Sequence, residues 1–114
     1  MATLSYITLL VDDVDSAKDW YVRHLGLSVS WESADFVLLA GDGADLGLHR
    51  GSPLSEPEKV QLHFRVANVD ADYERLTAEG LTFYKRPETK PWGHRTAYLS
   101  DPAGHTVELY TPIR

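Results

Sequence analysis

Two stretches of this 114-residue chain decide its fold: YITLLVDDVDSAKDWYVRHLGLSV at residues 6–29 and QLHFRVANVDADYERLTAEGLTF at residues 61–83. Each begins with alternating apolar residues, which is the pattern of a half-buried strand. Each then reaches a Val-Asp pair, at Val14 and Val69, and continues with helical periodicity for about ten residues. Because the two Val-Asp pairs lie 55 residues apart, the sequence predicts two copies of one strand-helix unit.

Both predicted helices carry signals for where they begin and end. Asp15 and Asp70 are natural N-caps, since a short acidic side chain can accept a hydrogen bond from the first free backbone N–H groups. Gly26 and Gly80 are natural residues for the position just after a helix, where a positive φ is common. The sequence therefore predicts helices of similar length in the two copies.

Three short apolar segments separated by turn residues follow each helix, which adds three strands to each unit. These strands are predicted at about 28–32, 36–39 and 45–49 in the first copy, and at about 82–86, 95–99 and 105–111 in the second. The order is βαβββ twice, which belongs to the α+β class. We expect residues 1–114 to form one domain, with module 1 at about 3–50, a linker at 51–59 and module 2 at about 60–114.

Composition narrows the kind of partner. Seventeen acidic and eleven basic side chains give a net charge of −6, which disfavours binding to nucleic acid or to anionic membranes. No apolar run approaches the roughly 18 residues of a membrane span, and the N-terminus lacks a signal-peptide pattern. We therefore expect a soluble, cytoplasmic protein. His24 and His105 lie near the end of a helix and beside a turn, and both are expected at the surface.

Glu108 is the acidic residue that the turn chemistry does not explain. It lies in YLSDPAGHTVELY, residues 98–110, where Asp101, Pro102 and Gly104 account for a tight turn between two strands. Aligning the two copies places Glu108 at the same depth of its strand as Gly47. The same alignment pairs Tyr6 of the first strand with Gln61, so the repeat defines four equivalent strand positions.

The chain resembles the vicinal oxygen chelate superfamily, the group of glyoxalases, bleomycin resistance proteins and extradiol dioxygenases. The resemblance rests on residues 7–27, on residues 69–81 and on PWGHRTAYLSDPAGHTVELY at residues 91–110, of which DPAGHTVEL is the most specific piece. It implies paired βαβββ modules whose mixed sheets curl around a cleft, often completed in a homodimer. In metal-dependent members, one ligand comes from each of the four inward strand positions.

Carried over to this chain, the resemblance leaves an incomplete metal site. Glu108 matches the last ligand and Gln61 is a weak oxygen donor, whereas Tyr6 is a poor ligand below its pKa of about 10 and Gly47 has no side chain. We therefore expect no metal and no other cofactor. The alternative is one divalent ion, Ni, Zn, Mn or Fe, held by His49, His63 and Glu108, with Gln61 as a further donor. This alternative requires the two histidines, each displaced by about 6.6 Å from a ligand position, to converge on Glu108.

Three functions from different classes follow. The first is a binding protein of the bleomycin-resistance kind, which holds a small organic molecule, aromatic or cationic, and confers antibiotic resistance without breaking a bond. The second is a metal-dependent lyase, isomerase or dioxygenase of the glyoxalase kind, acting on vicinal oxygens with Glu108 as metal ligand and base. The third is a catalytically silent scaffold or regulatory dimer.

The binding hypothesis predicts a set of ligand-contacting residues. Trp92 would stack on a planar ligand, and Arg95 would bind an anion or pair with Glu108. Trp20 and Tyr21 on the first helix are expected in the core or in a subunit contact. The predicted ligand-binding residues are Tyr6, His49, Gln61, His63, Trp92, Arg95, Tyr98 and Glu108.

Overall fold

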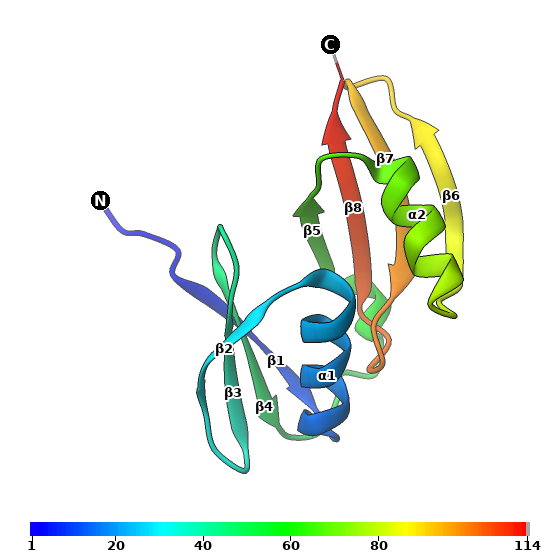
Figure 1. The fold of residues 1–114 in the computed structure, drawn as a ribbon. Helices are drawn as coiled ribbons and strands as arrows, with labels where there is room; N and C mark the ends of the chain where they lie inside the picture. Colours follow the sequence, from blue (N-terminus) through cyan, green and yellow to red (C-terminus); the bar gives the residue numbers. More distant parts are fainter. Residues whose placement is uncertain (114) are drawn as a thin grey trace. The chain divides into compact units, whose positions relative to one another are not determined.

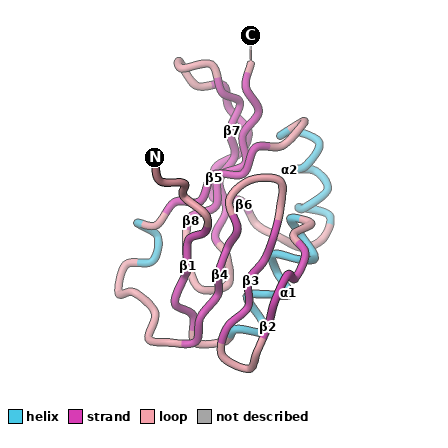
Figure 2. The backbone as a smooth tube through the Cα atoms, turned by 90° about the vertical axis from the view of Figure 1, so that its left-hand side faces the viewer, coloured by secondary structure: helices cyan, strands magenta, loops and turns pink. Residues whose placement is uncertain are grey.

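The first module is a four-stranded sheet with one helix on one face (Figures 1 and 2). Its elements are β1 (Tyr6–Val11), α1 (Val14–Leu25), β2 (Ser28–Glu32), β3 (Phe36–Ala40) and β4 (Asp45–Arg50). The strand order is β1-β4-β3-β2; β1 runs parallel to β4, and the remaining pairs are antiparallel. The computed structural model describes residues 1–113, so Arg114, the last residue of the predicted second module, lies outside the described residues.

Helix α1 begins and ends through its own sequence. The Asp13 side chain accepts a hydrogen bond of 3.0 Å from the backbone N–H of Ser16, which makes Asp13 the N-cap. The expected cap, Asp15, is wrong by two residues and lies in the first helical turn. Gly26 ends the helix at φ 73°, as predicted. Trp20 and Tyr21 are buried on a helix that contacts β3 and β4 of its own sheet, so they are core residues.

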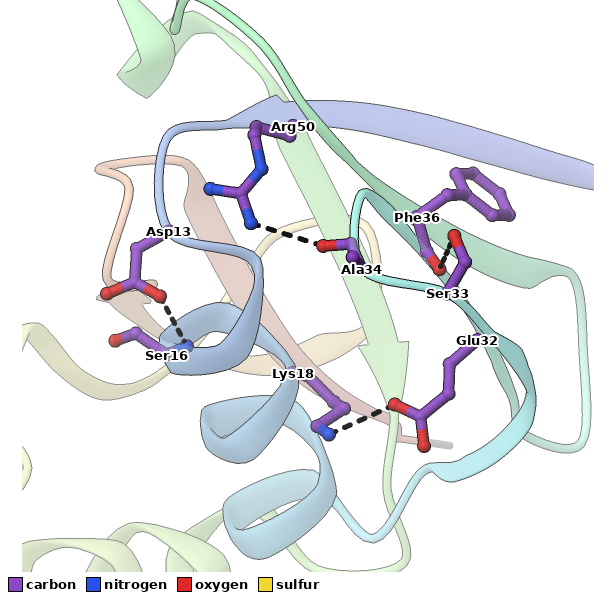
Figure 3. A network of polar contacts seen from close by, with 8 residues as sticks. All are labelled: Asp13, Ser16, Lys18, Glu32, Ser33, Ala34, Phe36 and Arg50. Atoms are coloured by element: carbon purple, nitrogen blue, oxygen red, sulfur yellow. Dashed lines mark hydrogen bonds and ion pairs between the residues drawn. The ribbon is translucent and has the colours of Figure 1, made fainter.

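Polar contacts at the surface of module 1 connect the β2–β3 hairpin to the neighbouring elements (Figure 3). Arg50 at the end of β4 donates to the Ala34 carbonyl at 3.1 Å and to the Asp35 carboxylate at 2.9 Å. Lys18 on α1 reaches Glu32 on β2 at 3.1 Å. These pairs are exposed, so each contributes little to stability, but together they fix the β2–β3 turn in place.

The second module repeats the architecture. Its elements are the 3₁₀ turn η1 (Pro57–Lys59), β5 (Gln61–Arg65), α2 (Val69–Ala78), β6 (Phe83–Thr89), β7 (His94–Ser100) and β8 (Thr106–Pro112). The strand order β5-β8-β7-β6 matches that of the first module, and β5 runs parallel to β8. The N-cap of α2 is Asn68, again two residues before the predicted cap Asp70, and Gly80 has φ 97°.

Each helix covers one face of its own sheet, and that face holds the apolar core. In module 2, α2 buries Val69 and Leu76 against strand residues that alternate along β7 and β8. The buried strand residues are Ala97, Leu99, Val107 and Leu109. The opposite face of this sheet, called here the open face, carries the intervening residues of β7 and β8.

The turn between β7 and β8 contains a buried hydrogen bond between an aspartate and a histidine. Asp101 and His105 are each 1% exposed at their side chains, and the His105 Nδ1–H donates to Asp101 Oδ2 at 2.8 Å. The other carboxylate oxygen accepts the backbone N–H groups of Ala103 and His105. The prediction that His105 lies at the surface is therefore wrong, because the aspartate gives its ring a partner inside the module.

The predicted α+β class and the βαβββ order are confirmed, and the six strands that were given predicted limits lie within three residues of them. Contacts along the chain define two units, Met1–Ser55 and Glu56–Arg114, which correspond to the two modules. Among the described residues, no helix is long and apolar enough to cross a membrane. The predicted cleft between modules stays a prediction.

Candidate functional site

Glu108 lies at the centre of β8 with one neighbour on each flanking strand. It pairs with His63 on β5 and with Tyr98 on β7. Residues paired in this way across neighbouring strands project from the same face of a sheet. The register therefore brings three side chains together on the open face, and we call this group the Glu108 triad.

Both carboxylate oxygens of Glu108 are engaged within the triad. Oε1 lies 2.5 Å from Nδ1 of His63, and Oε2 accepts a hydrogen bond of 2.8 Å from the Tyr98 hydroxyl. The Glu108 side chain is 7% exposed, whereas that of His63 is 50% exposed. A buried carboxylate is tolerated where donors satisfy it, and these two contacts are that compensation.

Tyr98 is held as a neutral phenol. Burial disfavours the phenolate and, together with the hydrogen bond to Glu108, raises the pKa of Tyr98 to about 12. A neutral phenol can donate to a carboxylate, whereas a phenolate beside it would be repelled. Tyr98 therefore remains a hydrogen-bond donor to Glu108 throughout the physiological pH range.

Aromatic and cationic side chains from β6 and the β6–β7 loop surround Tyr98. The ring of Tyr84 lies 6.0 Å from that of Tyr98, and its hydroxyl donates to Thr106 Oγ1 at 3.3 Å. The Nζ atoms of Lys85 and Lys90 lie 5.8 and 6.0 Å from the centre of the Tyr98 ring. Tyr84 and Lys85 also line an open hollow of about 520 Å³ along β6.

The equivalent place in module 1 holds no charged side chain. Gly47 on β4 pairs with Thr8 on β1 and Leu38 on β3, in the same register as the Glu108 triad. A Cβ atom at Gly47 would lie 2.7 Å from Thr8 Oγ1 and 3.0 Å from two ring carbons of Phe36. The Phe36 ring thus fills the space that a side chain at position 47 would need.

The remaining residues predicted for the site are distributed over both modules. Tyr6 and His49 lie in module 1 on exposed strand positions, and His49 lies beside the Phe36 ring at 5.9 Å. Gln61 is exposed on β5, two residues before His63. Trp92, 64% exposed, lies in the loop between β6 and β7, 5.9 Å from Lys90 Nζ.

Arg95 is placed away from Glu108, and the predicted Arg95–Glu108 pair is wrong. Its guanidinium makes two hydrogen bonds, of 3.0 and 3.1 Å, to the carboxylate of Asp70 on α2. Arg95 and Tyr98 are three residues apart on one strand, so they project from opposite faces. The ion pair holds the pKa of Asp70 below its usual range and fixes the start of α2 on the sheet.

The donors at the four family ligand positions do not fit a metal site. Gly47 offers no donor atom, Tyr6 is a phenol, and both oxygens of Glu108 already accept hydrogen bonds. Within residues 1–113, no three or more His, Cys, Asp or Glu side chains gather in a way that could hold an ion. The His63–Glu108 half of the alternative site is present, but nothing described adds a third ligand to it.

Several neighbours of the triad were not predicted from the sequence. Lys85 and Lys90 gave no signal, because isolated lysines usually lie in solvent. Tyr84 was not among the residues predicted for the site. A bulge in β6 between Phe83 and Lys85 brings Tyr84 and Lys85 toward Tyr98, and such an irregularity is invisible to simple alternation.

Comparison with known proteins agrees with this architecture. YraH of Bacillus subtilis (strain 168) is 27% identical over 123 residues, covering 94% of this chain and 96% of YraH. A glyoxalase/bleomycin resistance protein/dioxygenase from Nocardioides has a TM-score of 0.83 at 26% identity, covering 100% of this chain and 85% of that one. TnmS3, an antibiotic binding protein from Streptomyces sp. CB03234, has a TM-score of 0.80 at 29% identity, covering 98% and 97%.

One further match, which covers most of the chain, identifies the family. A sequence model of the glyoxalase/bleomycin resistance protein/dioxygenase superfamily matches residues 3–109, which span both modules and end just after Glu108. The paired βαβββ modules and their strand order agree with that match. This chain belongs to the glyoxalase/bleomycin resistance protein/dioxygenase superfamily.

Proposed function

We propose that this protein binds a small organic molecule on the open face of module 2, without a metal ion. The observation that carries the proposal is the Glu108 triad: a buried carboxylate held by Tyr98 and by a half-exposed His63. A core strand does not need such a group for packing. Fixed polar groups next to aromatic rings are typical of sites for small organic ligands.

The surroundings of the triad supply the rest of the site. The rings of Tyr84 and Trp92 are 53% and 64% exposed, so both have area to offer a planar molecule. Gln61 lies two residues before His63 on β5 and adds an exposed amide to the same face. In this proposal the ligand lies over these residues and contacts His63.

The antibiotic-binding protein TnmS3 supports this choice among the family's activities, because it combines 29% identity with nearly full coverage of both chains. The chemistry at position 47 also argues against the metal-dependent alternative, since glycine cannot ligate an ion. Both observations support the proposal that this chain is a binding protein of the superfamily, and antibiotic resistance is one role that binding would serve.

The test is a thermal-shift screen of aromatic metabolites and antibiotics, followed by mapping of each hit through backbone amide chemical shifts. We expect hits to perturb the amides of His63, Tyr98 and Glu108. The variant His63→Asn should weaken these hits, while His24→Asn, a change at a histidine on α1 of module 1, should not. Hits that perturb module 1 alone would contradict the proposal. Near-stoichiometric bound metal that is lost in Glu108→Ala would also contradict it.

A homodimer remains part of the proposal through the family resemblance. The burial of Trp20 and Tyr21 within module 1 removes one reason for expecting it, because these rings are not available to a partner subunit. Sedimentation at micromolar concentration should give twice the monomer mass of 12.8 kDa. A monomer under these conditions would refute the dimer without affecting the binding site proposed in module 2.

A further inference from the structure

Glu108 has no carboxylate oxygen left without a protein donor. His63 engages Oε1 and Tyr98 engages Oε2, and the side chain is 7% exposed. A carboxylate in this state is a poor direct partner for a ligand, because a ligand donor would first have to displace one of the two protein donors. The polar group that remains accessible in the triad is the imidazole of His63.

The hydrogen bond to Glu108 determines which nitrogen of His63 faces outward. An ionised carboxylate can only accept, so Nδ1 of His63 must carry the hydrogen in this contact. In the neutral imidazole, Nε2 is then an acceptor, and it lies on the ring edge that points away from Glu108. The side chain is half-exposed, so part of the ring is accessible to solvent.

We propose that Nε2 of His63 accepts a hydrogen bond from a hydroxyl group of the ligand, and that the ligand is a planar phenol or enol rather than an organic cation. This inference rests on the proposed function and names the ligand class of the same site. Glu108 acts through His63: it fixes the ring and its tautomer, and it is a positioning residue.

The charges near the triad favour a neutral or anionic ligand. Lys85 and Lys90 lie within 6.0 Å of the Tyr98 ring centre, and Glu88 is the carboxylate that pairs with Lys90. An ammonium ligand would have to approach these two cations, whereas a phenol oxygen would gain from them. A cationic ligand was one of the predicted classes, but the two carboxylates near the site are already engaged by protein donors, Glu108 by His63 and Tyr98 and Glu88 by Lys90.

The tautomer is tested first, without any ligand. Nitrogen chemical shifts of His63, recorded where the imidazole is neutral, should show a protonated Nδ1 and a bare Nε2. Glu108→Gln should shift the population toward the other tautomer, because an amide can donate as well as accept. Glu88→Gln is the matched control and should change nothing. A wild-type His63 that carries its hydrogen mainly on Nε2 would overturn the proposal.

The ligand class is tested with three matched probes: 2-naphthol, 2-methoxynaphthalene and 2-naphthylmethylamine. Binding is followed through the amide shifts of the triad at probe concentrations up to millimolar. We expect 2-naphthol to bind about tenfold more tightly than its methyl ether, which is the effect of one hydrogen bond. The amine should bind more weakly than the naphthol, and Lys85→Met should reduce that difference.

His63→Asn separates the roles of the two ring nitrogens, because its amide can replace the Nδ1 donor to Glu108 but offers nothing at the place of Nε2. In this variant the naphthol and its ether should bind equally. Equal binding of all three probes to the wild type would overturn the ligand class while leaving the binding function intact. If no probe perturbs the triad at millimolar concentration, both the inference and the proposed function fail.

Discussion

The two modules share one backbone plan, yet they hold opposite chemistry at the same register positions. On the β4 side, Gly47 pairs with Thr8 and Leu38; on the β8 side, Glu108 pairs with His63 and Tyr98. The first set is covered by an aromatic ring, and the second forms a hydrogen-bonded triad. The pairing of the strands therefore determines which three side chains lie together, in both modules. The identity of those residues determines whether they can bind a polar group.

The largest effect is expected when Gly47 in module 1 is replaced by glutamate, the residue found at the equivalent position of module 2. We expect Gly47→Glu to lower the free energy of unfolding by about 3–5 kcal/mol, because the new side chain would overlap both the Phe36 ring and the Thr8 hydroxyl at a buried strand position. Urea unfolding followed by circular dichroism measures the loss.

Gly43→Glu is the matched control for this substitution. Gly43 lies in the β3–β4 turn, and a Cβ atom there meets nothing within 4 Å. The control should change stability by less than about 0.5 kcal/mol. If the two variants unfolded at the same urea concentration, the space above Gly47 would not be filled as described.

The β3–β4 turn of module 1 and the β7–β8 turn of module 2 offer a second comparison. Asp101 accepts three hydrogen bonds in the β7–β8 turn, and its pair with His105 is buried. Asp101→Ala should therefore cost about 2–4 kcal/mol, since it leaves a buried imidazole without its acceptor. Asp42→Ala, in the exposed β3–β4 turn, should cost less than about 0.5 kcal/mol. Equal losses in thermal or urea unfolding would contradict a special role for the Asp101 turn.

Removing the charge of Glu108 tests how much the triad contributes to module 2. Glu108→Gln keeps the shape but weakens the contacts to His63 and Tyr98, and we expect a loss of about 1–3 kcal/mol. Glu88→Gln removes an exposed carboxylate of the same module and should cost less than 1 kcal/mol. A Glu108→Gln variant as stable as the wild type would mean that the triad is maintained for binding alone.

The smallest expected effect is a loss of stability at alkaline pH, and this loss is absent at neutral pH. Because the folded pKa of Tyr98, about 12, exceeds the ordinary value of about 10, the folded state binds the phenol proton more tightly. Stability from this residue is complete below about pH 10 and falls as the pH rises toward 12. Urea unfolding at about pH 9 and about pH 11 should show this decline in the wild type.

Two variants separate the causes of this decline. Tyr98→Phe should reduce it. Glu108→Gln should lower the pKa of Tyr98 only in part, because burial is the larger cause and remains. A phenolate absorbance titration in which Tyr98 ionises near its ordinary pKa would contradict the described burial.

The sequence predicted the fold well because local signals and the repeat agreed with each other. Alternation placed all eight strands, and the glycines after each helix were correct. The predicted N-caps were each wrong by two residues, because the observed N-caps are Asp13 and Asn68. Several acidic or amide side chains precede each helix, and any of them can cap it. Propensity identifies the residue type for a cap but not the choice among adjacent candidates.

The site was predicted only in part. Alternation assigns a face, so His63 could be placed on the face of Gln61, but it cannot give the offset between neighbouring strands that puts His63 beside Glu108. Arg95 was predicted to pair with Glu108, although it lies three positions before Tyr98 on the same strand, and this odd offset places the two side chains on opposite faces. His105 was misplaced because a partner four residues away, Asp101, buries it through the tertiary structure of the turn.

The parallel pairing of β5 with β8 has a consequence for the order in which the module forms. The β7–β8 hairpin joins residues close in the chain, whereas the contact between His63 and Glu108 closes a separation of 45 residues. Long-range pairing bears a larger loop-closure cost, so β5 docks late in folding and detaches early. As an edge strand of its sheet, β5 can open while the hairpin persists. The His63 side of the proposed site is thus expected to be the last part of module 2 to assemble, and the amide protons of β5 should be among the first to exchange with solvent.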